Sequence, residues 1–383
     1  MDIGGLPETL RAHYSAFLRS PRVLMTGHSH QAWPDAARDG LIRAFDDAAE
    51  HVDDKWERAF EAAEAVRNAV AERISAKAED IALGASCHEL VSRFLSALDW
   101  TKRRHVVTTT GEFHSLRRQL ERLREAGVEV TFVNAEPVAT LAARIADAIR
   151  TDTAAALVST VLFETSAIVP DLREIADASH RQGAHVLFDA YHAFNVVPFR
   201  VAELGPDPVF VTAGGYKYAQ WGEGCCFLRV PPDCDLRPVY TGWFADFAHL
   251  DSPPAAGSVA YGDVGAERFA GSTYDPASHY RARSVIEFFK EHGLGVDVLR
   301  ALSLRQTSRL LAALAAFEIR TPREDHARGG FVALRIAHAS DIVKRLRAEN
   351  IFVDARGDTL RLGPAPYTTD DEIDRAAAVL SAS

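Results

Sequence analysis

Short apolar segments alternate with amphipathic helical segments over residues 81–212, and this alternation constrains the fold more than any other feature of the sequence. Strands that are apolar on both faces and alternate with helices are typical of a mostly parallel sheet with helices on both sides, a doubly wound α/β domain. In such a sheet, ligands bind beyond the carboxyl ends of the strands. The pattern predicts strands at 81–83, 105–108, 128–133, 155–162, 185–188 and 208–212, with helices at 87–98, 115–126, 140–149 and 172–182.

The regions on either side of this segment have different patterns. Helical periodicity dominates 35–75, whereas 231–276 is rich in Pro, Gly, Asp and aromatic residues and has no clear period. Two helices, at 277–292 and 296–317, are expected to precede a small α+β unit with strands at 331–336, 351–354 and 359–362 and helices at 340–349 and 369–381. We therefore expect three parts: an N-terminal segment (1–55) that packs on the small domain and on the rim of the site, a large ligand-binding domain (56–265), and a small C-terminal α+β domain (266–383).

Composition narrows the class of partner. The formal net charge of −10, without a basic stripe, argues against nucleic acid and against an anionic membrane surface. Cysteines stand at positions 87, 225, 226 and 234, a spacing that matches neither a disulfide framework nor a zinc ligand set. The first residues lack the pattern of a signal peptide, and no apolar run is long enough to span a bilayer. We expect a cytoplasmic protein without a metal site.

Two predicted strand ends carry groups suited to chemistry. In 186–192 an apolar strand ends in Asp189, and His192 follows it; in 211–224 a strand ends in a glycine-rich turn that presents Lys217. A lysine that forms an imine must be partly neutral, which requires burial or a cationic neighbour. A carboxylate held against a pyridine nitrogen keeps that nitrogen protonated, so that the ring becomes an electron sink. Alone, Asp189 would be interpreted as a cap or turn residue and Lys217 as a surface lysine; together they favour function.

These stretches resemble the class V aminotransferase superfamily of fold-type I pyridoxal-phosphate (PLP) enzymes, and within it most of all kynureninase. The kynureninase pattern has an Asp-x-Ala-His strand end and a Thr/Ser-Tyr-Lys-Tyr segment, where this chain has Asp189-Ala190-Tyr191-His192 and Gly215-Tyr216-Lys217-Tyr218. The likeness extends in order over residues 22–375. It implies a seven-stranded, aspartate-aminotransferase-like sheet with PLP bound in the large domain.

The resemblance also implies roles for individual residues. Lys217 would carry PLP as a Schiff base, and Asp189 would pair with the pyridine nitrogen. His192 takes the place of a residue that contacts the phenolic oxygen of the ring, although a buried core histidine is an equally good interpretation. Tyr216 resembles the tyrosine that hydrogen-bonds the phosphate.

Further cofactor contacts are expected where two helices begin. Ser86 and Cys87 follow a strand and open a helix, where backbone N–H groups and the helix dipole hold phosphate; Ser86 can equally be a simple N-cap, and the two roles are compatible. Phe113 stands where the family places an aromatic residue over the ring face. A core phenylalanine is the alternative.

Substrate contacts and a partner subunit follow from the same resemblance. Arg361 resembles the arginine that grips a substrate α-carboxylate, a task that suits a bidentate guanidinium; a surface arginine is the alternative. Ser272 and Thr273 resemble a segment that reaches the phosphate of a partner subunit, and Trp243 a segment that shapes the substrate pocket. The resemblance thus implies a homodimer with a shared active site.

The chain departs from kynureninase in several places. Residues 26–34 replace a Gly-Asn-Ser-Leu-Gly segment, and we interpret His28 and His30 there, with Trp33, as a substrate-pocket rim; a solvent-facing turn is the alternative. Residues 245–247 lack the expected histidine, Gly215 replaces a hydroxyl residue, and Gly271-Ser272-Thr273 stands where kynureninase carries Asn-Pro-Pro.

Because of these departures, the reaction stays open among members of one superfamily. The first hypothesis is kynureninase-type hydrolytic Cβ–Cγ cleavage of an amino acid, via a substrate aldimine and a carbanion. The alternatives are a class V aminotransferase, an epimerase or a β-eliminating lyase, which share the α-proton step. A cysteine desulfurase is disfavoured, because no cysteine follows Cys234. A non-catalytic protein of the same fold is disfavoured because Lys217, Asp189 and Arg361 are all present.

Overall fold

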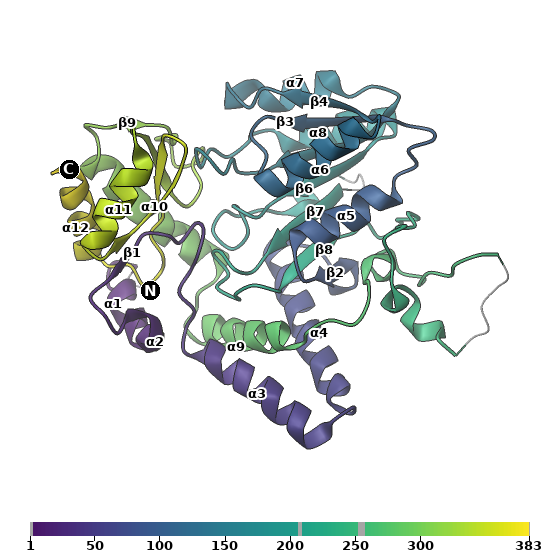
Figure 1. Ribbon diagram of the computed structural model, residues 1–383, viewed down its shortest axis with the longest axis horizontal. Coiled ribbons are helices and arrows are strands. Elements are labelled where there is room, and N and C mark those ends of the chain that lie inside the picture. Colours follow the sequence, from purple (N-terminus) through teal and green to yellow (C-terminus); the bar gives the residue numbers. More distant parts are fainter. Residues whose placement is uncertain (1–2, 206–208, 252–256, 383) are drawn as a thin grey trace.

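A seven-stranded sheet forms the centre of the larger domain (Figure 1). The computed structural model describes residues 3–205, 209–251 and 257–382. The strands lie in the order β2-β8-β7-β6-β5-β3-β4. Their bounds are β2 Ile81–Gly84, β3 His105–Thr109, β4 Glu129–Val133, β5 Thr153–Ser159, β6 His185–Asp189, β7 Val209–Gly214 and β8 Cys226–Arg229.

The sheet is parallel except for β8, which pairs antiparallel with both β2 and β7. The sequence interpretation missed β8, because this short strand returns directly from the turn after β7 and has no helix before it to mark its start. The other six strands were all predicted, within a few residues of their observed bounds. Pro208, which the prediction included in β7, lies outside the described residues.

Alternate residues of the central strands face two separate cores, so helices cover both sides of the sheet. Val107 and Val158 pack in one core with α4 Lys55–Ile74, α7 Leu141–Ala148 and α8 Leu172–Gln182. Val106 and Leu157 pack in the other core with α5 Cys87–Ala97 and α6 His114–Glu125. Burial on both faces explains why these strands are apolar throughout, and the doubly wound arrangement is confirmed.

The smaller C-terminal domain is an α+β unit at the side of the large sheet, and both chain ends lie near it (Figure 1). Its antiparallel sheet has the order β12-β13-β10-β9, and its helices bury a core of their own against that sheet. The elements are α10 Val296–Ala313, β9 Glu318–Ile319, β10 Val332–Arg335, α11 Ala339–Ala348, β11 Ile351–Phe352, β12 Asp354–Arg356, β13 Thr359–Leu362 and α12 Asp370–Ser381.

The N-terminal part connects the two domains. Helices α1 Leu6–Leu10 and α2 Ser15–Leu18 precede β1 Val23–Leu24, which pairs with β11 of the small domain. The chain then forms α3 Ala36–His51, which lies along α9 Ala277–Glu291 (Figure 1). The helical stretch expected at 35–75 is divided between α3 and α4 at Val52, whose φ of 52° ends the helix. The three-part division of the chain stays a prediction.

Across the described ranges, none of the helices combines the length and the apolar character that crossing a bilayer requires.

Candidate active site

The carboxyl ends of the parallel strands converge on a cavity of about 310 Å³. Asp189 ends β6, Ser159 ends β5, and Lys217 follows β7 within the glycine-rich turn. The loops after β2 and β3 add the starts of α5 and α6. This is the edge at which doubly wound sheets bind ligands, and it brings together these predicted residues: Ser86, Cys87, Phe113, Asp189, His192, Tyr216 and Lys217.

Lys217 is a buried amine, with only 5% of its surface exposed. Its Nζ atom lies 2.7 Å from Nε2 of His192. It also lies 4.5 Å from the ring centroid of Tyr191 and 5.7 Å from that of Phe113. Burial lowers the pKa of Lys217 to about 7, although the Asp189 carboxylate opposes this shift. A substantial neutral fraction at pH 7 is what attack on a carbonyl carbon requires.

Asp189 and His192 lie near this amine, and burial shifts their pKa values in opposite directions. Burial raises the pKa of Asp189, and its carboxylate accepts the backbone N–H of Tyr191 at 2.9 Å. A buried carboxylate gains most from a cationic partner. Burial and the charge of Lys217 hold the pKa of His192 well below its usual range, so the ring is neutral. Its Nδ1 atom is buried and has no hydrogen-bond partner among the described residues.

The start of α5 gives the cavity an anion-binding end. Ser86 is the N-cap, since its side chain accepts the N–H of Glu89 at 3.2 Å, and this confirms one of the two roles expected for it. Backbone N–H groups at the start of a helix attract anions, especially phosphate. Tyr216 lines the same cavity.

These features fit PLP, the cofactor that the sequence resemblance implies. The cavity offers a partly neutral amine for an aldehyde, a buried carboxylate for a cationic ring nitrogen, aromatic walls for a flat ring and a helix start for a phosphate. Lys217 and Asp189 would hold the reactive carbon and the ring nitrogen, and Phe113 would contact a ring face.

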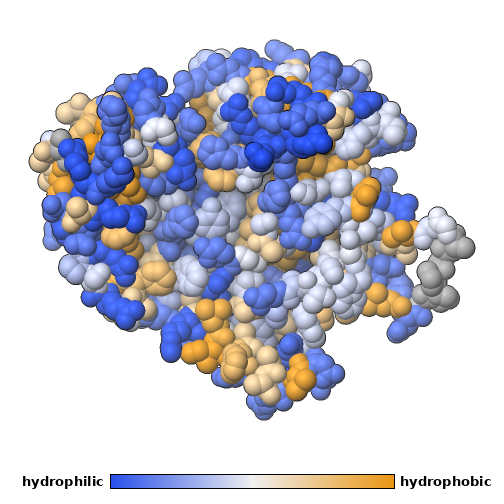
Figure 2. All heavy atoms as spheres, in the orientation of Figure 1, coloured by the Kyte–Doolittle hydropathy of each residue, from blue (hydrophilic) through white to orange (hydrophobic). Residues whose placement is uncertain are grey.

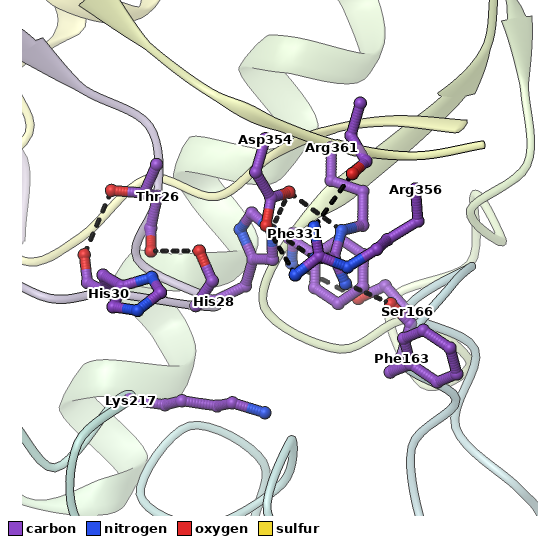
Figure 3. Close-up of polar contacts among 12 residues, drawn as sticks. Thr26, His28, His30, Phe163, Ser166, Lys217, Phe331, Asp354, Arg356 and Arg361 are labelled. Atoms are coloured by element: carbon purple, nitrogen blue, oxygen red, sulfur yellow. Dashed lines mark hydrogen bonds and ion pairs between the residues drawn. The ribbon is translucent and has the colours of Figure 1, made fainter. Parts of the chain in front are cut away.

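Arg361 lies in a buried ionic network above this amine (Figure 3). It stands on β13 directly opposite Asp354 of β12. Its Nε and one terminal nitrogen donate to that carboxylate at 2.9 and 2.6 Å, and its other terminal nitrogen donates to the carbonyl of Phe163 at 2.7 Å. His28, which is fully buried, contacts the same carboxylate at 2.9 Å. Lys217 extends into the space beneath the network from the opposite side.

The charges in this network have clear causes. Burial tends to raise the pKa of Asp354, but the hydrogen bond from His28 and the pairing with Arg361 hold it well below its usual range. Burial lowers the pKa of His28 to about 4, so its ring is neutral at pH 7. Gly363 admits the histidine, because a Cβ atom there would lie 2.3 Å from its Nδ1 atom. His28 is thus a fully buried member of this network, which excludes the solvent-facing turn for it; its place at the rim of a substrate pocket stays a prediction.

Other predicted site residues lie away from the Lys217 cavity. His30 is exposed and packs loosely against Tyr216. Ser272 and Thr273 line a second cavity of about 960 Å³, which shares Ala85, Glu223 and Gly224 with the Lys217 cavity. The indole N–H of Trp243 donates to Thr273 at 3.1 Å. The expected roles of these residues in substrate binding and in a partner's site stay predictions.

Three groups of this site were not identified from the sequence. Tyr191 lay inside the Asp189 motif but was assigned no role. Glu112, beside Phe113, is buried and accepts hydrogen bonds from Ser159, and burial raises its pKa to about 7. Asp354 could have been found from the hairpin, because the turn at 357–358 sets it opposite Arg361.

Comparisons with known proteins agree with this architecture. A family model described as "Kynureninase C-terminal domain" matches residues 299–380. Kynureninase from Bacillus cereus (strain ATCC 10987 / NRS 248) is 30% identical over 246 residues, which are 62% of this chain and only 56% of that enzyme. The uncharacterized aminotransferase YcbU of Bacillus subtilis (strain 168) is 26% identical, and the match covers 85% of each chain.

Solved structures share the fold at low sequence identity. A C-DES mutant with glycine covalently linked to its PLP cofactor superposes with a TM-score of 0.84 at 18% identity, over 97% of this chain and 98% of that one. The apo cysteine desulfurase from Thermococcus onnurineus NA1 gives a TM-score of 0.83 at 17% identity, over 98% of both chains. The sequence relatives support the superfamily that the Asp189 and Lys217 segments predicted, the class V aminotransferases, and the solved structures confirm the fold.

Proposed function

We propose that this chain is a PLP-dependent enzyme that acts on an α-amino acid, with Lys217 as the residue that holds the cofactor. The observation that carries this proposal is the buried Lys217 amine beside His192, in the cavity that Asp189 also lines. When bound, PLP supplies an aldehyde for covalent attachment and a cationic ring that withdraws electrons from the carbon next to the substrate amine.

The residues of the chain divide the remaining tasks. Asp189 would keep the ring nitrogen of a bound cofactor protonated, because its buried carboxylate favours a cation beside it. Lys217 would be the base nearest the α-carbon of a bound substrate. Its pKa of about 7 suits a group that both takes and returns a proton at neutral pH. His192 is neutral and its Nε2 atom lies 2.7 Å from the amine, so it can accept a hydrogen bond from the amine or donate one to it.

Arg361 is the proposed anchor for the substrate α-carboxylate. Asp354 occupies the side of the guanidinium formed by Nε and one terminal nitrogen. Each terminal nitrogen carries two hydrogens, so N–H groups remain for a second carboxylate. The Asp354 carboxylate holds the guanidinium of Arg361 in one orientation, which favours a defined substrate position.

For the reaction itself we propose kynureninase-type hydrolysis, in which water adds to a γ-carbonyl and the Cβ–Cγ bond breaks. The likeness of residues 299–380 to the kynureninase C-terminal domain and the identity to kynureninase support it. A class V aminotransferase is the second candidate, because the match to YcbU extends over more of both chains. The departures at 26–34 and 245–247 bear on the substrate side chain and leave the cofactor residues intact.

The cofactor proposal is tested by absorbance. Purified protein incubated with PLP should show a visible band, and borohydride should then fix the cofactor's mass on Lys217. Lys217→Ala should lose both signals, whereas Lys102→Ala, an exposed lysine, should keep them. Wild-type protein that takes up no PLP would refute the assignment.

The two candidate reactions are separated by their products. Hydrolysis of kynurenine releases anthranilate and alanine, and the release is followed by anthranilate fluorescence. Transfer of the amine to an added keto acid without anthranilate release would favour the aminotransferase. Neither product from a PLP-loaded protein would exclude kynurenine as the substrate and call for a screen of amino acids by the spectral change of the bound cofactor.

We also propose that the chain acts as a homodimer with Ser272 and Thr273 at a shared site. Exposed apolar side chains support this proposal. They include Phe45 on α3 and the aromatic group of Tyr240, Trp243 and Phe247. Contiguous exposed apolar surface of this kind marks protein interfaces.

A further inference from the structure

Tyr191 places a phenol in the cofactor cavity where the kynureninase pattern has alanine. Gly214, the last residue of β7, makes room for it. A Cβ atom at Gly214 would lie 2.3 Å from the Tyr191 hydroxyl and 2.4 Å from Sγ of Cys226, both shorter than any tolerable contact. The hydroxyl therefore occupies the space that any other residue at 214 would fill.

This hydroxyl lies beside the start of α5. It is 3.6 Å from Sγ of Cys226, a long contact to a weak acceptor. That same sulfur accepts the backbone N–H of Cys87, the first residue of α5. The phenol is thus separated from the helix start by one sulfur atom. Burial raises the pKa of Tyr191 well above its usual value, so the hydroxyl keeps its proton at neutral pH and can donate it.

The shape of PLP decides which part of the cofactor meets this corner. On the pyridine ring, the nitrogen is opposite the carbon that carries the aldehyde, and the phosphate arm is attached next to that carbon. With the nitrogen at Asp189 and the aldehyde carbon at Lys217, the phosphate arm lies on one flank of the lysine and the phenolic oxygen on the other. The start of α5 attracts an anion, whereas His192 is neutral and does not. The phosphate arm is therefore assigned to the flank of the lysine that faces α5.

We propose that the Tyr191 hydroxyl is a ligand of the cofactor phosphate, together with the N–H groups at the start of α5. This inference rests on the proposed PLP function. The ring of Tyr216 packs against that of Tyr191 with centroids 5.1 Å apart, which fixes the direction of the phenol. A hydrogen bond to a doubly charged phosphate is stronger than one to a thiol, so the hydroxyl exchanges its contact with Cys226 for a better one.

The test compares two ligands that differ only by the phosphate. Affinities of cofactor-free protein for PLP and for pyridoxal are measured by visible absorbance, in wild type and in Tyr191→Phe. The variant keeps the ring and removes only the hydroxyl. We expect PLP affinity to fall about tenfold or more, as for loss of a charged hydrogen bond, and pyridoxal affinity to stay within about twofold, a difference below the usual worth of one hydrogen bond.

Matched variants make the result specific. Tyr218→Phe removes a buried hydroxyl that has no hydrogen-bond partner among the described residues, and it should leave both affinities unchanged. Gly214→Ala should displace the phenol and reproduce the selective loss of PLP affinity. The ³¹P resonance of bound PLP should shift in Tyr191→Phe and not in Tyr218→Phe, while the thermal midpoints of the cofactor-free proteins verify folding.

The other outcomes have distinct meanings. Equal weakening of both ligands in Tyr191→Phe would place the hydroxyl at the ring or in the fold and overturn the proposal. Unchanged PLP affinity would overturn it as well. Wild-type protein that binds neither ligand would instead refute the PLP function itself.

Discussion

At the residue scale, the proposed chemistry depends on the pKa of Lys217. Burial lowers this pKa to about 7, so its neutral fraction should rise about tenfold from pH 6 to pH 8 and then level off. An ordinary lysine, with a pKa of about 10.4, gains about 100-fold over the same interval and keeps rising. We expect the acylation rate of Lys217 in cofactor-free protein, measured by mass spectrometry with a neutral reagent, to follow the first profile.

The exposed Lys344 provides the internal control for this titration. Its hydrogen bond to Asp341 raises its pKa, so its reactivity should continue to increase above pH 9. If the two lysines rise in parallel over the whole range, Lys217 is an ordinary amine and its role as nucleophile is contradicted.

The pairing of Asp354 with Arg361 makes a second prediction at this scale. Asp354→Asn removes the charge that orients Arg361, and we expect KM for the amino-acid substrate to rise about tenfold, the worth of one charged hydrogen bond. The turnover number and the PLP affinity should change little, because neither Lys217 nor Asp189 touches this carboxylate. Asp341→Asn, at an exposed position of α11, is the control. Loss of PLP affinity in Asp354→Asn would contradict the assignment.

The sequence predicted the chemical groups of the site better than their partners. Lys217, Asp189 and Phe113 follow strands whose carboxyl ends must meet, so their convergence could be inferred. Asp354 could be inferred from the hairpin that pairs it with Arg361, but His28 could not, since the pairings of β1 with β11 and of Thr26 with Gly363 bring it to that carboxylate. Such contacts join residues that are hundreds of positions apart, and no local pattern records them.

At the element scale, the contact between α3 and α9 is close enough to require glycine. A Cβ atom at Gly40 would lie 2.6 Å from the carbonyl oxygen of Tyr280 and 2.9 Å from the Cα atom of Arg281. Alanine is favoured over glycine within a helix by about 1 kcal/mol, but a clash with backbone atoms costs about 1–3 kcal/mol. We therefore expect Gly40→Ala to lower the free energy of unfolding, measured by urea denaturation.

The control for this variant is Asp46→Ala, an exposed position on the same helix. It should change stability by no more than about 0.5 kcal/mol. A Gly40→Ala protein more stable than wild type would mean that helix propensity dominates, and that α3 does not pack on α9 as closely as described.

Most elements could be predicted because apolar periodicity and length identify them. The elements that were missed, among them β1, β8, β9 and the short N-terminal helices, are too short for either signal. The break between α3 and α4 was missed for another reason, since the residue in the left-handed conformation is Val52. Valine rarely adopts the left-handed conformation, so the residue type at position 52 predicts no turn.

At the scale of the whole molecule, apolar side chains are exposed in two places. On α3 they are Ile42 and Phe45, with Val52 just beyond its end, and Figure 2 shows hydrophobic residues gathered over this helix at the lower edge. The second place lies in 239–251 and 257–264, beside the larger cavity, where Trp243 and Phe247 are each 46% exposed. Leaving so much apolar surface in water is unfavourable by about 25 cal/mol per Å². A second copy that covers both places would remove this penalty.

We therefore expect light scattering to give twice the chain mass of 41.9 kDa for the wild type at micromolar concentration. Phe247→Glu combined with Phe45→Glu places two carboxylates in the proposed interface, and burying them unpaired is strongly unfavourable, so this variant should be monomeric. Ser340→Glu, at an exposed position of α11 in the small domain, should stay dimeric. PLP affinity should fall in the monomeric variant if Ser272 and Thr273 complete the site of the other subunit. A wild type of 41.9 kDa would contradict the dimer, and a monomeric variant with unchanged PLP affinity would contradict the shared site alone.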